Sequence, residues 1–488
     1  MTPARQTHQL KPLRKTPTGI PGMEEITGGG LPKGRPTLIA GAAGCGKTLF
    51  AMEFLVNGAT EYDEPGVFVA FEENAEELAQ NVASLGFNLK QLSTQKKLIV
   101  DHIRVERSEI EETGDYDLEG LFIRLGYAID SIGAKRVVLD TIEVLFSSFS
   151  NEGILRAELQ RLFRWLKDKG VTAVITAERG EGTMTRFGLE EYVADCVILL
   201  DHRVTEHIST RRLRIVKYRG TLHGTNEYPF LIGKRGISVL PITSLTLEHK
   251  ASTERISTGI RELDDMLDGK GFYRGSSILL SGTAGTGKTS FACSFVDAAC
   301  ERGERCLYFA FEESADQIVR DMRSIGLNLT THIKKGLLQI HVARPSQYGL
   351  EMHLVTIYDL IREYKPSLVV LDPITDFASI GSGFEIKSAV TRMIDFLKVN
   401  QVTGLFISVT PGDRGSNQSM VGISSLIDAW VTLHYMENNG ERHRGLFVLK
   451  SRGMAHSNQI RSFQLTDDGI HIGKRDFAGS GVGENSKK

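Results

Sequence analysis

The stretch Gly41-Ala42-Ala43-Gly44-Cys45-Gly46-Lys47-Thr48 recurs later in the chain as Gly282-Thr283-Ala284-Gly285-Thr286-Gly287-Lys288-Thr289. Both fit G-x-x-x-x-G-K-[ST], a loop whose backbone N–H groups surround phosphates while its lysine reaches the β- and γ-phosphates and its threonine hydroxyl holds Mg²⁺. Each copy follows a predicted strand, residues 36–40 and 277–281, and precedes a predicted helix, residues 49–58 and 290–301. Because the motif requires this strand–loop–helix context, the sequence predicts two phosphate-binding loops.

Later motifs repeat as well, which indicates that whole domains are duplicated. Residues 66–73 (GVFVAFEE) and 306–313 (CLYFAFEE) lie at nearly the same distance from their loops. Residues 136–140 (RVVLD) and 368–372 (LVVLD) each read as an apolar strand that ends in an acid. The first copy carries extra acidic residues at 109–117, where a surface loop would tolerate an insertion.

Length and charge fit two domains. The chain has 488 residues, with 58 Lys and Arg against 60 Asp and Glu, so it lacks the basic signature of a nucleic-acid-binding protein. We expect a flexible N-terminal segment at residues 1–15, a first domain at 16–247, a second at 248–478 and a disordered tail at 479–488, which has little apolar material to bury.

Targeting signals and metal-binding cysteine patterns are not found in the sequence. No apolar run approaches the roughly 18 residues of a membrane span, and the polar, basic start does not resemble a secretory signal, so we predict a cytoplasmic protein. The five cysteines show no C-x-x-C or Cys/His spacing, which favours reduced thiols. Cys45 alone lies in a phosphate loop, where it is either a harmless small residue or a redox-sensitive one.

Apolar strands alternate with longer helical patterns, such as residues 155–168 and 389–399. That alternation predicts an α/β fold with a parallel sheet flanked by helices in each copy. Ligands of such sheets bind at the C-terminal ends of the strands. The phosphate loops, the Glu pairs and the strand-ending Asp residues should all lie at that edge.

Two acids end predicted buried strands. Asp140 and Asp372 would support Mg²⁺ through water or through the threonine of the loop. The alternative is a structural aspartate that caps the turn after its strand. Because each acid accompanies a phosphate loop, we favour the metal-supporting role.

Paired glutamates end the neighbouring strands. Glu72-Glu73 and Glu312-Glu313 could orient and deprotonate a nucleophile aimed at the γ-phosphate. An isolated Glu-Glu is usually a solvated helix start. Because the pair recurs after the same Phe-rich strand in both copies, a catalytic role is favoured.

A third repeated feature lies late in each copy. On a strand, residues two apart point the same way, so Lys217 with Arg219, and Lys450 with Arg452, would each form a two-cation face. Spacing alone does not decide between this and an ordinary solvated edge strand. Cations supplied by a neighbouring subunit would stabilise charge on a transferring phosphoryl group.

The two loops, the Phe-Glu-Glu strand ends, and KYRGTLH at 217–223 followed by EYPF at 227–230 closely resemble the KaiC family, double RecA-like ATPases of the cyanobacterial clock and their bacterial relatives. The resemblance spans nearly the whole chain. It implies two tandem RecA-like P-loop NTPase domains and a two-tiered homohexamer, with ATP between neighbouring subunits in both rings.

The resemblance also implies roles for individual residues. Glu72 and Glu312 correspond to the catalytic carboxylates, and Thr48, Thr289 and Glu312 would lie at the metal. The ATP-binding residues implied for the first ring are Gly44, Cys45, Gly46, Lys47, Thr48 and Leu49, with Ser84, Lys217, Tyr218, Arg219, Thr221 and His223 reaching across the interface. Those implied for the second ring are Gly285, Thr286, Gly287, Lys288, Thr289 and Ser290, with Arg444, Lys450, Ser451, Arg452 and His456.

The family autophosphorylates adjacent hydroxyl residues in its second ring. Ser424 and Ser425 match that segment, with Glu312 as the base, although the family commonly has Ser followed by Thr. Without the family, two adjacent serines before an apolar run read as a helix cap or a turn. The equivalent place in the first copy, residues 191–192, has no hydroxyl pair.

Some positions depart from the family. Ile325 stands where an aromatic residue lies beside the second-ring adenine, and Met454-Ala455-His456 lacks the usual Trp, so nucleotide preference in that ring could differ. The short tail after Ile472 argues against regulation by a KaiA-like activator. A KaiB-like partner is compatible with the resemblance, but no residue spacing indicates it.

The sequence therefore predicts a KaiC-like, Mg-ATP-dependent ATPase and serine autokinase with autophosphatase activity, acting in timing or signalling. One alternative is a RecA/RadA-like DNA-dependent ATPase, for which the basic run at residues 211–214 could form a nucleic-acid strand. Near-neutral charge without interleaved aromatic and basic residues opposes it. Another alternative is a tandem signalling ATPase whose Ser424 and Ser425 are never modified.

Overall fold

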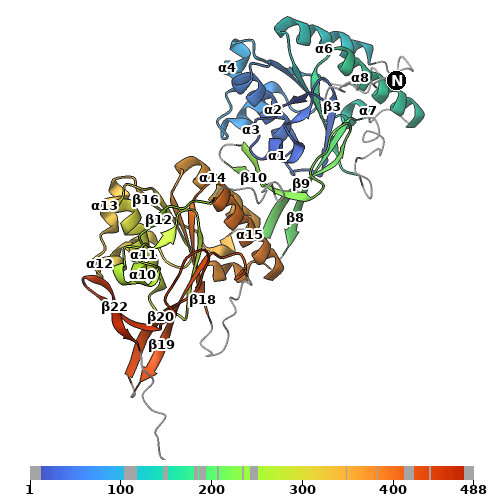
Figure 1. Cartoon of the computed structure of the whole chain (residues 1–488). Coiled ribbons are helices and arrows are strands. Elements are labelled where there is room, and N and C mark those ends of the chain that lie inside the picture. The colour runs from blue at the N-terminus through green and yellow to red at the C-terminus, as the bar shows by residue number, and fades with distance from the viewer. Residues whose placement is uncertain are drawn as a thin grey trace, which may run out of the picture. The chain divides into compact units, whose positions relative to one another are not determined.

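The computed structural model describes residues 13–103, 118–146, 152–180, 185, 194–205, 208–233, 236–241, 251–347, 349–381, 383–410, 423–438 and 441–476. The chain forms two compact units, Met1–Ser244 and Leu245–Lys488, each built on a nine-stranded sheet covered by helices (Figure 1). The predicted tail at 479–488, the acidic insertion at 109–117 and residues 191–192 lie outside the described residues, as does most of the segment at 1–15.

The first sheet has the strand order β11-β10-β9-β8-β3-β7-β6-β4-β5. The six strands from β8 to β5 are parallel, and β9, β10 and β11 extend the sheet in antiparallel fashion. Their bounds are β3 (Pro36–Gly41), β4 (Gly66–Ala70), β5 (Leu98–His102), β6 (Arg136–Asp140), β7 (Thr172–Glu178), β8 (Cys196–Thr205), β9 (Ile208–Tyr218), β10 (Glu227–Gly233) and β11 (Gly236–Val239); β1 (Lys15–Thr16) pairs separately with β2 (Leu31–Pro32).

Helices cover both faces of the first sheet because its central strands are apolar on both sides. The described helices are α1 (Met23–Thr27), α2 (Lys47–Glu61), α3 (Ala75–Ala83), α4 (Leu89–Thr94), α6 (Glu119–Ile132), α7 (Glu143–Phe146) and α8 (Glu152–Asp168). Ile39 and Phe68 pack with α1–α4, whereas their chain neighbours Leu38 and Val67 pack with α6–α8. Neighbouring side chains on a strand point to opposite faces, so continuous apolar runs require two helical layers.

The second unit repeats this arrangement in the order β16-β15-β17-β18-β14-β19-β20-β21-β22. Its strands are β14 (Ser277–Gly282), β15 (Cys306–Ala310), β16 (Leu338–Val342), β17 (Leu368–Asp372), β18 (Thr403–Val409), β19 (Ala429–Asn438), β20 (Glu441–Ser451), β21 (Arg461–Thr466) and β22 (Gly469–Asp476), with β12 (Arg255–Ile256) pairing β13 (Phe272–Tyr273). The helices are α10 (Arg261–Met266), α11 (Lys288–Glu301), α12 (Ala315–Arg323), α13 (Leu329–Lys334), α14 (Leu350–Tyr364) and α15 (Gly383–Val399), with 3-10 turns η1 (Pro345–Gln347) and η2 (Ile374–Ser379).

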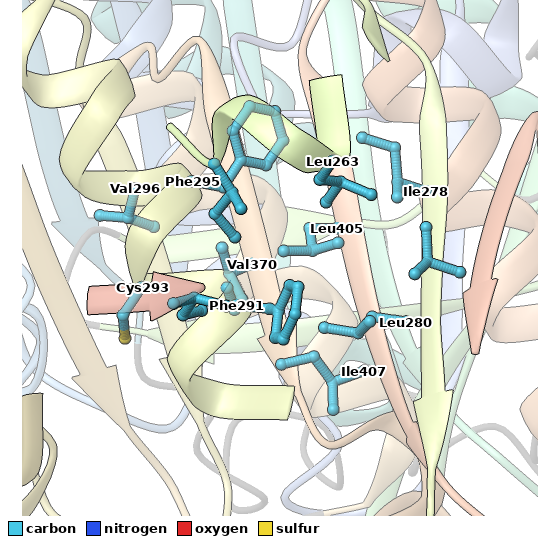
Figure 2. Close-up of a cluster of buried hydrophobic side chains, with 14 of the residues drawn as sticks. Leu263, Ile278, Leu280, Phe291, Cys293, Phe295, Val296, Val370, Leu405 and Ile407 are labelled. Carbon is cyan, nitrogen blue, oxygen red and sulfur yellow. The ribbon is translucent and has the colours of Figure 1, made fainter. Parts of the chain in front are cut away.

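One core of the second unit lies under the helix that follows its phosphate loop. Phe291 and Phe295 of α11 pack against Leu280 of β14 and Leu405 of β18 (Figure 2). Helices α14 and α15 cover the other face of the sheet (Figure 1). The predicted α/β fold, with two tandem P-loop domains and parallel sheets flanked by helices, is confirmed; the antiparallel extension is an addition that the alternation of strands and helices did not predict.

A fully buried arginine ties the first unit together. Arg136, at the start of β6, donates to Glu64 Oε2 (2.8 Å), the Phe54 carbonyl (2.7 Å) and the Pro17 carbonyl (2.9 Å). Its guanidinium also lies over the Phe54 ring, 4.5 Å from the centroid. The second copy has Leu368 at this position and lacks this tether.

We predict that Arg136→Met lowers the free energy of unfolding of the first unit by about 3 kcal/mol, because it removes the buried donor shared by the half-buried Glu64 carboxylate and the Phe54 and Pro17 carbonyls. Urea denaturation would measure the loss of unfolding free energy, and amide hydrogen exchange at residues 15–20 would show whether it occurs in the first unit. Arg305→Met removes an exposed arginine with one bond to the Tyr364 carbonyl, and should change stability by less than about 0.5 kcal/mol. Equal effects of the two substitutions would contradict a structural role for Arg136.

A buried glutamate fixes the hairpin beside the first phosphate loop. Glu53 of α2 accepts a hydrogen bond from the Ile237 N–H (2.7 Å), and burial raises the pKa of Glu53 to about 8 even though this bond and one with Asn57 lower it. The hairpin packs over the loop, since a Cβ added at Gly46 would lie 3.1 Å from Ile232 Cδ1. Glu53 therefore helps to position the loop.

We predict that wild-type stability declines from about pH 5 to pH 8 through Glu53, because the folded protein keeps a proton that the unfolded chain has released. Glu53→Gln is neutral throughout, so its stability relative to wild type should rise over this range by up to about 1.4 kcal/mol per pH unit. Urea midpoints at several pH values would measure this. Glu301→Gln, at the exposed end of α11, should run parallel to wild type; a parallel Glu53→Gln profile would contradict the prediction.

Candidate functional site

Both predicted phosphate loops connect a buried strand to a helix N-terminus. In the first loop, Gly44 and Gly46 have φ of +73° and +108°, which side chains other than glycine rarely adopt. These turns place the loop N–H groups and the positive end of α2 at one spot, the arrangement that binds anions. Lys47 is buried at the start of α2 and donates to the Gly41 (2.9 Å) and Ala42 (3.1 Å) carbonyls, so its ammonium group lies in the loop.

The second loop has the same geometry. Gly285 and Gly287 have φ of +77° and +100°, and Lys288 donates to the Thr283 carbonyl (2.8 Å). Burial lowers the pKa of Lys288, while the charges of Asp372 and Glu312 oppose that shift. Leu49 and Ser290, also predicted contacts, occupy the first turns of α2 and α11 beside these loops.

The strand-ending acids contact the loop threonines, as the metal-supporting interpretation requires. Asp372 accepts hydrogen bonds from Thr289 (3.0 Å) and Tyr308, and Asp140 accepts from Thr48 and Thr176. Burial raises the pKa of both carboxyl groups, and these hydrogen bonds oppose the rise.

The glutamate pairs leave β4 and β15 at the same sheet edge. Glu72 accepts a hydrogen bond from Thr141 (3.4 Å), directly after Asp140, and exposed Glu73 accepts one from Asn81 (3.3 Å). Helices α3 and α12 are capped by Asn74 and by Ser314, not by the glutamates. The glutamates are therefore not needed as helix caps.

Sequence reasoning missed an acid beside Glu312. Asp376, in η2, forms a side-chain hydrogen bond with Glu312, and burial together with the Glu312 charge raises the pKa of Asp376 to about 6. Burial, followed by the charge of Asp372, also raises the pKa of Glu313. The available signal was an acid four positions after Asp372, where the first copy has Val144.

The two predicted acceptor serines lie in an exposed turn between buried anchors. Ser424 and Ser425 are exposed, whereas Ile423 and Ile427 on either side are fully buried. Lys450 donates to the Ser424 carbonyl (2.7 Å), and Arg452 donates to the Ser425 carbonyl (2.6 Å). The turn and the predicted two-cation face are thus parts of one site.

Strands β9 and β20 lie inside their sheets, but their outer neighbours β10 and β21 pair with residues 212–214 and 444–446 and do not reach the lysines. Among the described residues, Lys217 pairs with Val197 and Lys450 with Trp430, so strand order does not decide between a two-cation face and a solvated edge. A register shift interrupts each strand's pairing just before its lysine, between Val197 and Ile198 in the first unit and between Trp430 and Val431 in the second. Such bulges re-aim side chains near sites. Arg219 and Arg452 lie just beyond the strand ends.

Other predicted contacts of the first domain have local partners. Tyr218 is buried and donates to the Gly30 carbonyl (2.7 Å), so a nucleotide contact by this residue would use its main chain. Arg219 lies 3.9 Å from the Asp195 carboxylate, and His223 Nδ1 is 2.9 Å from the Gly224 carbonyl. Ser84 is the C-cap residue that follows α3, and Thr221 Oγ1 donates to the Leu222 carbonyl (3.2 Å).

Among the predicted contacts of the second domain, Arg444 pairs with Tyr435 across β19 and β20, and Ser451 is the last residue of β20. His456 Nδ1 lies 3.3 Å from the Ser457 carbonyl in the following segment. All five cysteines are free and buried, and burial raises the pKa of Cys45, which disfavours its reactive thiolate.

Comparison with known proteins agrees with the two-loop geometry. The ATPase family described as KaiC matches residues 16–244 and, separately, 256–476. The chain belongs to the KaiC family of ATPases. It is 59% identical over 462 residues to circadian clock protein KaiC2 of Synechocystis sp., covering 94% of this chain and 81% of that protein.

More distant KaiC proteins also match over most of their length. Circadian clock protein KaiC3 of Synechocystis sp. is 39% identical over 467 residues, or 95% of this chain and 92% of KaiC3. Circadian clock oscillator protein KaiC of Synechococcus elongatus is 37% identical over 475 residues, or 97% of this chain and 91% of that protein. The family is one of nucleotide-binding ATPases, which favours ATP hydrolysis over the RecA/RadA-like, DNA-dependent alternative.

No helix in the described part of the chain is long and apolar enough to cross a membrane. Nor do the described residues contain a group of three or more His, Cys, Asp or Glu side chains placed to hold a metal ion. A protein cage of that kind is not needed for Mg²⁺, which is usually bound by one or two carboxylates, substrate phosphates and water.

We predict that Asp140→Asn and Asp372→Asn each reduce ATP hydrolysis and raise the Mg²⁺ concentration it requires, because an amide keeps the shape but loses the charge that favours the cation. In the double variant Asp140→Asn/Asp372→Asn, the rate of ATP hydrolysis should fall by at least about tenfold. Phosphate release over a Mg²⁺ titration would measure it, with Asp130→Asn on the exposed end of α6 as control. An unchanged Mg²⁺ requirement would show that both acids are structural caps.

Proposed function

We propose that the protein is a Mg-ATP-dependent ATPase and serine autokinase whose second domain phosphorylates Ser424 and Ser425. The observation that carries this proposal is the contact of Lys450 and Arg452 with the carbonyls of these two serines. Cations held at the backbone of the acceptor serines would stabilise charge on an incoming phosphoryl group. Exposure of both serines leaves them accessible to a nucleotide.

The residues of both loops fit a magnesium ion. Thr48 with Asp140, and Thr289 with Asp372, pair a hydroxyl with a carboxylate next to the phosphate loop, and Glu312 is the further candidate ligand in the second domain. Mg²⁺ would neutralise charge on the β- and γ-phosphates of bound ATP.

Glu312 is the proposed base of the autokinase. Its carboxylate takes the proton of the serine hydroxyl as Oγ bonds to the γ-phosphorus and the bond to the ADP oxygen breaks, so phosphoserine and ADP are the products. Lys288, in the loop, and the Lys450–Arg452 pair would balance the phosphate charge. Glu72 would instead orient water in the first domain, where the proposed reaction is hydrolysis alone.

The proposed assembly is a homohexamer with nucleotide between neighbouring subunits. In that arrangement the first-domain residues Ser84, Lys217, Arg219, Thr221 and His223 would reach an ATP across the interface. The named relatives are circadian clock proteins, which supports a role in timing, with a KaiB-like protein as a candidate partner.

The test is peptide-level mass spectrometry of the purified protein before and after incubation with Mg-ATP. We predict mass gains of about 80 Da, one phosphoryl group each, on the peptide that holds Ser424 and Ser425. Glu312→Gln should abolish them, because an amide cannot accept the proton. Dephosphorylation of the same peptide after ATP removal would report the companion phosphatase activity.

Glu72→Gln is the matched control, because it makes the same change at the equivalent position of the first domain. It should lower hydrolysis while the second-domain serines still gain phosphate. ATP hydrolysis without any phosphate on that peptide would contradict the autokinase and leave a tandem signalling ATPase. Stimulation of hydrolysis by single-stranded DNA would instead revive the DNA-dependent alternative.

A further inference from the structure

One tyrosine of the second unit is fastened to the phosphate loop. The Tyr435 hydroxyl, on β19, donates a hydrogen bond to the Gly285 carbonyl at 2.7 Å. A Cβ added at Gly285 would lie 3.1 Å from the Tyr435 hydroxyl oxygen, so the tyrosine closely approaches the loop backbone. The Arg442 guanidinium covers the Tyr435 ring at 4.0 Å from its centroid and restricts the ring's position.

This contact fixes the orientation of one peptide group of the loop. The carbonyl of Gly285 and the N–H of Thr286 belong to the same planar peptide and point in opposite directions. A donor that holds the carbonyl outward therefore also sets the direction of the next N–H. Phosphate binding by such loops depends on the directions of their N–H groups, so the tyrosine acts on the group that recognises ATP.

In the described part of the first unit, the residue at the corresponding strand position makes a different contact. The strand pairing of β3 with β8 and of β14 with β19 places His202 at the position of Tyr435. His202 Nε2 lies 2.7 Å from Ser209 Oγ on the neighbouring strand β9. The difference concerns the second domain alone.

Polar side chains join the same two strands of the second unit. Trp430 Nε1 donates to Ser281 Oγ (2.7 Å), and Ser281 Oγ is also 3.2 Å from Thr432 Oγ1. The matching positions of the first unit are Ala40, Val197 and Leu199, which have no side-chain donor or acceptor. Strand β19, which begins shortly after Ser425, is thus joined by side-chain hydrogen bonds to strand β14, which leads into the loop, and to the loop itself.

We propose that Tyr435 is a positioning residue for the second phosphate loop, setting the ATP affinity of that domain. The inference rests on nucleotide binding by the second domain and not on phosphorylation of Ser424 or Ser425. It also gives a physical link between loop and acceptor turn, because one strand carries Tyr435 and directly continues the serine segment. Tyr435 does not itself contact the reacting atoms.

The test compares Tyr435→Phe with Tyr364→Phe in the full-length protein. Tyr364 is a matched control, since its hydroxyl also donates to a glycine carbonyl, that of Gly336 (2.8 Å), and an arginine, Arg305, also covers its ring (5.8 Å). Titration with a fluorescent ATP analogue would measure the Kd of each domain. Lys47→Ala should remove ATP binding by the first domain and Lys288→Ala that by the second, so these two variants assign each class of binding site to its domain.

Tyr435→Phe should weaken only the class that Lys288→Ala removes, by about 2- to 10-fold, the range of one hydrogen bond. In ATP turnover by that class, KM should rise while kcat stays nearly constant, since binding and transition state lose the same contact. Tyr364→Phe should leave both Kd values unchanged. Equal Kd values in Tyr435→Phe and wild type would overturn the proposal. A higher Kd would also overturn it if the urea midpoint of Tyr435→Phe fell, since lost stability would then explain the change, or if Tyr364→Phe raised the Kd equally. A protein that never phosphorylates its serines still gives a clear answer, because binding is measured.

Discussion

Each domain is organised around a loop of backbone N–H groups that must be held open at the end of a buried strand. Glycines with positive φ make the turn, and the following helix directs its positive end to the same point. Such a loop needs rigid surroundings, which the doubly covered sheets supply. Parallel strands then bring Asp140 or Asp372 and the paired glutamates to the same edge.

The duplicated domains use this frame differently. The first is tied by buried Arg136 and by Glu53, whereas the second has Leu368 and Ser294 at the matching positions. The second carries instead a tyrosine on its loop, an extra carboxyl group beside Glu312, and a turn of serines held by two cations. Differences of this kind would let one domain serve mainly hydrolysis and the other phosphoryl transfer, as proposed.

Sequence patterns predicted the parallel core, because motif, strand and helix occur together and repeat. Residues 136–140 and 368–372 form strands with the predicted bounds, and each terminal acid contacts its loop threonine. The sequence analysis did not predict the antiparallel extension, because the alternation of strands and helices along the chain does not show which strands pair late in each domain. Contacts such as Tyr435 with Gly285, about 150 positions apart, depend on strand order and have no local signature.

The most direct test of the central claim is an experimental structure of the full chain with Mg²⁺ and a non-hydrolysable ATP analogue. We predict nucleotide phosphates on both loops, a metal ion beside Thr48–Asp140 and Thr289–Asp372, and the Lys450–Arg452 pair of one subunit facing the nucleotide of its neighbour. Nucleotide on only one loop, or cations directed away from every nucleotide, would contradict it.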